Sequence, residues 1–165
     1  MTRKSLFTHL MIGFVGFVGG ALFWYLASPL FIDRVVDESL SESAKTRVLS
    51  TGSFQDVDSI HKGSGTATIY EGADGRRTLR LTDFEVTNGP DLKVWLVEKK
   101  DVQESSDVTD MPYVSLGVLK GNIGSQNYQI PADVDLSKYG SVVIWCEQFS
   151  QLFSPATLEM PIAGA

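Results

Sequence analysis

Cysteine is almost absent from this sequence: Cys146 is the one thiol among 165 residues. A single thiol excludes a disulfide within the chain, a Cys-x-x-Cys redox pair and a four-cysteine zinc site. Thiol–disulfide chemistry at Cys146 would therefore have to pass through a mixed disulfide with a second molecule.

Histidine is nearly as scarce, with His9 and His61 alone. Only His61 follows the apolar amino-terminal segment, whereas a blue-copper site needs two histidines beside its cysteine. A haem iron could take an axial ligand from a Cys, His or Met side chain. The candidates in this sequence are Cys146, His61, Met111 and Met160. No complete ligand set is visible, so we predict no metal site and leave the cofactor unknown, with haem and copper both open.

Clusters of basic residues are missing too. Two of the 14 Lys and Arg residues, Arg3 and Lys4, precede the apolar segment, and the rest of the chain carries 12 basic and 20 acidic residues. Phosphate binding needs clustered Lys and Arg, so we expect no nucleic-acid partner. No G-x-S-x-G motif or His/Asp pattern accompanies a serine, so we predict no enzyme activity and no catalytic residue.

An uncharged run from Leu10 to Ala27 is the first feature that is present. At about 1.5 Å per residue it nearly spans a hydrocarbon core of about 30 Å, and apolar neighbours extend it over 6–32. Basic residues before it predict a cytoplasmic tail over 1–5, a single-pass anchor and an extracytoplasmic remainder. A cleaved signal peptide needs small residues at positions −3 and −1, and Tyr25 lies at −3 when Ala27 is −1. We therefore favour a retained signal-anchor.

The segment 33–50 predicts a short helical stalk. Its apolar residues recur every four positions, at Val36, Leu40, Ala44 and Val48, which is one narrow stripe of a helix. The domain that follows, over 51–165, alternates short β-rich runs with Gly, Asp, Asn and Ser clusters. This texture predicts an all-β antiparallel sandwich of roughly seven to nine strands.

The stretch from Tyr139 to Phe153 is interpreted as the central strand of that sandwich. Its run of β-branched and aromatic residues is apolar on both faces, as in a strand covered from two sides. Alternation places Cys146 on one face, with Val142 and Ile144, and Trp145 on the other.

Several motifs follow one another in a fixed order over 51–161, including G-T-A-T-I-Y, L-R-L-T-D-F, N-G-P-D-L-K-V-W-L and S-V-V-I-W-C-E-Q-F. This order resembles the DM-thirteen domain family. The resemblance implies an all-β fold and an electron-transfer role, proposed for the family from its cysteine and from its association with DOMON domains and cytochrome-b-type membrane proteins in animals. The family's cysteine corresponds to Cys146, and we expect any redox partner to be a separate membrane or envelope protein.

Two interpretations of Cys146 stay open. In the first it is the redox residue of an accessory electron-transfer module, with His61, Trp145, Glu147 and Phe149 as candidate neighbours. In the second it is a buried core residue of a non-catalytic binding or assembly module, because free cysteine packs as a small hydrophobe. That module would present polar loops such as Lys99 to Tyr113, predicted to be solvated, to a partner.

Overall fold

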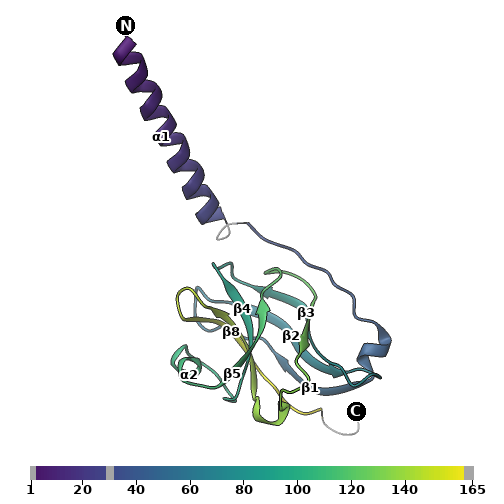
Figure 1. Ribbon diagram of the computed structural model, residues 1–165. Coiled ribbons are helices and arrows are strands. Elements are labelled where there is room, and N and C mark those ends of the chain that lie inside the picture. The colour runs from purple at the N-terminus through teal and green to yellow at the C-terminus, as the bar shows by residue number, and fades with distance from the viewer. Residues whose placement is uncertain (1–2, 29–31, 162–165) are drawn as a thin grey trace. The chain divides into compact units, whose positions relative to one another are not determined.

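The computed structural model describes residues 3–28 and 32–161, which divide into two units at Ile32 and Asp33. The first unit is built on one helix, α1 (Arg3–Ala27). The second unit is a β domain (Figure 1).

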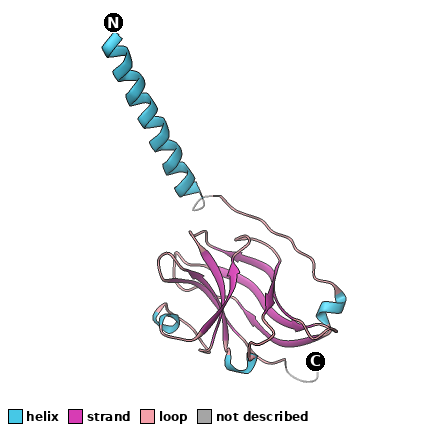
Figure 2. Cartoon of the chain, viewed as in Figure 1, coloured by secondary structure: helices cyan, strands magenta, loops and turns pink. Residues whose placement is uncertain are grey.

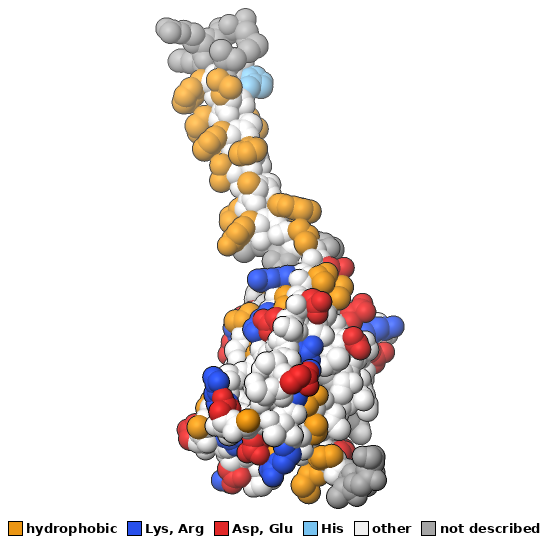
Figure 3. Space-filling model, turned by 90° about the vertical axis from the view of Figure 1, so that its right-hand side faces the viewer, with side chains coloured by type: hydrophobic (Ala, Val, Ile, Leu, Met, Phe, Trp, Pro, Cys, Tyr) orange, Lys and Arg blue, Asp and Glu red, His pale blue; other side chains and the backbone are white. Residues whose placement is uncertain are grey.

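Helix α1 is long and apolar enough to cross a membrane. Its span Phe7–Tyr25 covers 19 residues with a mean hydropathy of 1.6, and none of it is buried within the chain. Hydrophobic side chains line its described length, whereas charged side chains of both signs are interspersed on the β domain (Figure 3). An amino-terminal signal sequence would have the same length and composition. The predicted extension of the anchor through Leu30 and Phe31 lies outside the described residues.

The β domain consists of two four-stranded antiparallel sheets (Figure 2), which confirms the predicted all-β sandwich. Sheet A has the order β1 (Arg47–Ser53), β2 (Gly63–Glu71), β3 (Arg77–Val86) and β6 (Gln126–Ile130). Sheet B has the order β5 (Tyr113–Val118), β4 (Leu92–Val97), β7 (Ser141–Cys146) and β8 (Gln151–Thr157). Short helical turns lie at α2 (Ser106–Thr109) and η3 (Leu136–Lys138) in the connections.

Strand periodicity builds the main core between the sheets. Every second residue of β4 and β7 points inward, and so do Leu79 and Leu81 of β3; the residues of β4 and β7 are Leu92, Val94, Leu96, Val142, Ile144 and Cys146. Beyond Asp83, which has φ of 48°, the inward residues of β3 are Phe84 and Val86. A second cluster covers the outer face of sheet B and contains the alternate residues of β4 and β7, among them Trp95, Val97, Val143 and Trp145. The predicted division of β7 into two faces is therefore confirmed.

All six residues of β7 are buried, and the strand pairs with β4 on one side and β8 on the other. The interpretation of Tyr139 to Phe153 as one strand is wrong beyond Cys146, because the chain reverses at 147–150 and β8 begins at Gln151. Ser150 adopts the left-handed conformation, with φ of 50°, that such a tight reversal requires.

The predicted helical stalk is also wrong. We call residues 33–46 the strap: it is largely extended, with a single 3₁₀ turn, η2, at Glu42–Lys45, and β1 already begins at Arg47. Backbone N–H groups of Val36 and Glu38 donate to the carbonyls of Ile123 and Ser125, at 2.9 and 2.8 Å. An apolar stripe only one residue wide stabilises an isolated helix poorly. Hydrogen bonds to the β domain therefore determine the conformation of the strap.

Two glycines allow the strap to approach the sandwich. A Cβ at Gly121 would overlap the carbonyl oxygen of Arg34, and one at Gly124 would overlap that of Val36. Gly124 also has φ of +101°. Both positions therefore exclude side chains for as long as the strap is in place.

We predict that Gly124→Ala destabilises the domain by about 1–3 kcal/mol more than Gly117→Ala, measured by denaturant unfolding. Gly117 is a matched control because its φ is +113° but a Cβ added there would meet no atom within 4 Å. Both variants place a side chain at a positive φ, and only Gly124→Ala collides with the strap. Equal losses of stability would show that the strap contributes nothing to the fold.

Candidate functional site

Cys146 ends β7 on the face between the two sheets, and it is 0% exposed. Its neighbours across the ladder are Leu92 of β4 and Gln151 of β8. The thiol donates a hydrogen bond to the carbonyl oxygen of Pro90, with 3.0 Å between Sγ and O. In this conformation the thiol is bonded to a carbonyl oxygen and is enclosed by the domain.

Two turns, 88–91 and 147–150, adjoin the thiol. The N–H of Glu147 donates to the carbonyl of Asp91 at 3.2 Å, and Lys93 forms ion pairs with both carboxylates, at 2.7 Å to Asp91 and 3.4 Å to Glu147. Hydrogen bonding to Asp91, assisted by Glu147, raises the pKa of Lys93 and keeps the ammonium charged. Lys93 therefore links the two turns over the end of β7.

The four candidate neighbours of Cys146 occupy different places. Glu147 and Phe149 lie exposed in the turn that follows the thiol, and Trp145 points to the opposite face of β7. His61 bonds to Asp58, with 2.8 Å between Nδ1 and Oδ2, and its ring lies against Phe153 at 4.6 Å. None of the described contacts joins His61 to Cys146.

The described residues around Cys146 do not form a donor set for a metal ion. Over residues 3–28 and 32–161, no three His, Cys, Asp or Glu side chains lie close enough to hold a metal ion.

On the outer face of sheet B, three aromatic rings form a row across neighbouring strands. The rings of Trp145 (β7) and Trp95 (β4) stack at 5.4 Å between centroids, and those of Trp95 and Tyr113 (β5) stack at 3.8 Å with 10° between planes. We call these three residues the aromatic row. The sequence places Trp145 on this face of its strand, and alternation on the paired strands could have indicated the other two rings.

The connection between β4 and β5 covers part of this row. It was expected to be a solvated loop, but its Val102 and Val108 are buried in the outer cluster. The side chain of Ser105 accepts from the N–H of Leu152 at 2.9 Å, and Lys99 pairs with Asp107. Hydrogen bonding to Lys99 lowers the pKa of Asp107. Most residues of the loop are exposed, as expected, but these contacts anchor it to the outer face of sheet B.

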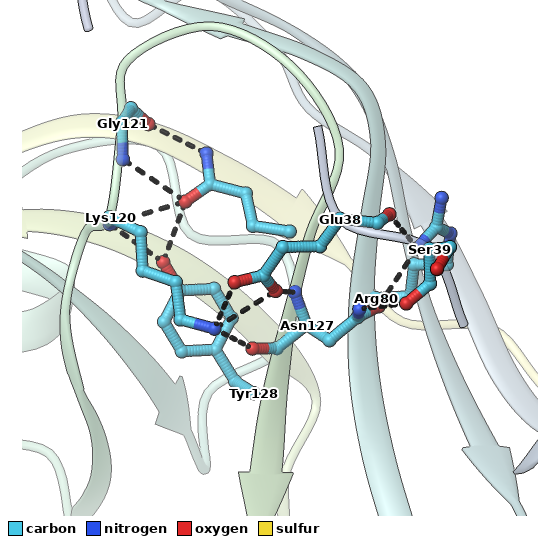
Figure 4. Close-up of polar contacts among 8 residues, drawn as sticks. Glu38, Ser39, Arg80, Lys120, Gly121, Asn127 and Tyr128 are labelled. Carbon is cyan, nitrogen blue, oxygen red and sulfur yellow. Dashed lines mark hydrogen bonds and ion pairs between the residues drawn. The ribbon is translucent and has the colours of Figure 1, made fainter. Parts of the chain in front are cut away.

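A polar cluster, the clamp, fastens the strap to the sandwich (Figure 4). The Glu38 carboxylate receives hydrogen bonds from Lys120, at 2.8 and 2.9 Å, and from the N–H of Asn127 at 2.8 Å. Arg80 donates both to the Glu38 carbonyl and to the Asn127 side chain, at 2.9 Å each. The Asn127 amide donates to the carbonyl of Ser39 at 3.0 Å.

Behind the clamp, buried Gln126 holds the 120–121 backbone in place. Its side chain accepts from Tyr128 at 2.8 Å and donates to the carbonyl of Gly121 at 2.6 Å. Burial raises the pKa of Tyr128 to about 12, so the phenol stays a hydrogen-bond donor. Lys120 is thereby aimed at Glu38.

We predict that Glu38→Gln destabilises the domain by up to about 1 kcal/mol at pH 7, because its side chain is 34% exposed and solvent screens the ion pair. Burial alone would raise the pKa of Glu38, but hydrogen bonds from Lys120 and Asn127 outweigh it and lower the pKa below the ordinary 4.5. The carboxylate therefore stabilises the fold above pH 4.5, and this contribution is lost as the pH falls through the lowered pKa.

The free energies of unfolding of the wild type and of Glu38→Gln should therefore become equal in acid. Glu42→Gln is the control within the strap: its side chain is 90% exposed and pairs only with Lys45 among the described residues, so its effect should stay within about 0.5 kcal/mol. If the difference in the free energy of unfolding between the wild type and Glu38→Gln did not change with pH, this result would contradict a stabilising role for the charged clamp.

Comparison with known proteins supports the expected family. A family model described as "Electron transfer DM13" matches residues 53–158, which include β2 to β8 and Cys146. No curated protein and no solved structure gives a significant match. Because the family model covers well over half of the chain, this protein belongs to the electron-transfer DM13 family.

Proposed function

We propose that this protein is a membrane-anchored, extracytoplasmic accessory redox module that exchanges electrons with a separate membrane or envelope protein. The family match over 53–158 is the observation that carries the proposal. Helix α1 supports the anchor, since its 19-residue apolar span has no protein surroundings within the chain. Arg3 and Lys4 before the span favour a cytoplasmic amino terminus.

Cys146 is the redox candidate of this module, and its burial defines how it would act. The resting thiol is enclosed, so exchange with a partner requires the 88–91 and 147–150 turns to open locally. The thiol then loses its proton to solvent, and the thiolate attacks one sulfur of a partner disulfide. A mixed disulfide forms and the other partner sulfur leaves as a thiolate.

A second candidate function is a non-catalytic binding or assembly module. The complete burial of Cys146 among Leu92, Ile144 and other core residues favours this alternative, because a packing cysteine needs no access to solvent. Exposed Met111 and Tyr113, at the edge of the β4–β5 loop, would then offer apolar contact area to a partner.

Labelling of Cys146 by a small neutral thiol reagent, in the full-length protein in detergent, separates the two candidates. The redox proposal predicts labelling without global unfolding, at a rate that Lys93→Met raises severalfold because the ion pairs across the turns are lost. Lys100→Met is the matched control: it removes the same charge and a pair with Glu159. Its labelling rate should equal that of the wild type.

A thiol that reacts only upon global unfolding, in a colourless and metal-free protein, would overturn the redox role of Cys146. The binding module would then be the better description. Cys146→Ser should in that case keep the fold, since a serine hydroxyl can still donate to the carbonyl of Pro90.

A further inference from the structure

The aromatic row has one end in the interior and one end at the surface. Trp145 and Trp95 are 4% and 5% exposed, while Tyr113, on the edge strand β5, is 48% exposed. The row therefore connects the middle of sheet B to solvent through rings that are in contact. Trp145 is also joined to Cys146 by a peptide bond, with the two side chains on opposite faces of β7.

Indole and phenol rings lose a single electron more readily than other uncharged rings in proteins, and phenylalanine does not at comparable potentials. Electron transfer between such rings is fast when they are in contact, because tunnelling falls steeply with distance. Stacking at 3.8 and 5.4 Å leaves no gap for an intervening side chain. The three residues thus have both the chemistry and the spacing of a relay.

The two ends of the row differ in how they handle the proton of an oxidised ring. The Nε1–H of Trp95 is buried and has no hydrogen-bond acceptor among the described residues. An oxidised Trp95 would therefore keep its proton as a radical cation and readily recover an electron. The exposed Tyr113 can release its phenolic proton to water when it is oxidised. The positive charge is thereby driven from Trp95 towards Tyr113.

We propose that the aromatic row carries single electrons across the outer face of sheet B, from the reduced metal centre of a partner protein that docks at Tyr113 to a one-electron oxidant near the β7–β8 turn. The oxidant, an oxidised metal centre or radical of a partner protein, takes an electron from Trp145. Trp95 then transfers an electron to the oxidised Trp145, and Tyr113 transfers an electron to the oxidised Trp95 while the phenolic proton of Tyr113 passes to water. One electron from the external reductant and one proton from water then restore Tyr113.

This relay rests on the proposed redox function but does not need the Cys146 thiol. A surface-connected route would let a module with an enclosed thiol exchange electrons without opening its core. An indole N–H without a hydrogen-bond partner in a well-packed cluster lowers the stability of the fold. In the relay, the missing partner keeps the proton on Trp95 when this ring is oxidised.

A photo-oxidant placed at the β7–β8 turn tests the relay. The full-length protein carries Cys146→Ser, which removes the native thiol, Trp24→Phe, which removes the anchor indole, and Phe149→Cys, which accepts a maleimide-linked ruthenium polypyridyl. Flash–quench oxidation of the ruthenium followed by transient absorption should show a tryptophan radical that decays into a tyrosyl radical. Tyr113→Phe should abolish the tyrosyl signal, whereas Tyr70→Phe, on sheet A, should leave it unchanged.

The replacement of Trp95 provides the decisive variant. Trp95→Phe should slow tyrosyl formation by about tenfold or more, corresponding to a barrier higher by about 1.4 kcal/mol, whereas Tyr70→Phe should leave the rate unchanged. Circular dichroism checks that both variants fold. Equal rates in Trp95→Phe and its parent would overturn the relay. Because the photo-oxidant replaces the natural partner and the thiol is absent, that failure leaves the labelling test of Cys146 unaffected.

Discussion

The structure depends on the burial of β7 from both sides. The strand lies between β4 and β8, and its side chains supply alternate members of two separate apolar clusters. An antiparallel strand usually has one wet face, so covering the second face needs additional structure. The β4–β5 loop provides it by burying Val102 and Val108 over the tryptophans. The face of β7 that a residue occupies therefore decides whether it is enclosed in the core or connected to the surface.

The two faces divide the chemistry of the domain. On the inner face, Cys146 is sealed by its bond to Pro90 and by two turns tied through Lys93. On the outer face, Trp145 opens a row of rings that reaches solvent at Tyr113. The same strand therefore has an enclosed thiol on its inner face and, on its outer face, a covered row of rings that reaches solvent only at Tyr113.

Much of this could be predicted from the sequence. Alternation correctly divided β7 between its two faces, and the order of motifs indicated the family. The strap was mispredicted because four-residue spacing is a local signal, whereas its conformation is determined by partners such as Ile123, Lys120 and Asn127, some eighty to ninety positions away. The aromatic row was missed for the same reason: strand pairing, not sequence distance, brings Tyr113 against Trp95.

The central claim is that β7 is a rigid, doubly covered strand on which Cys146 and Trp145 lie back to back. Native-state hydrogen exchange of the full-length protein tests it most directly, because each amide reports the free energy of the opening that exposes it. The amides of Val142 to Trp145 should exchange only through global unfolding, while those in the 147–150 turn exchange through smaller, local openings. Exchange of the β7 amides at the rate of that turn would show that the strand is not the rigid centre of the domain.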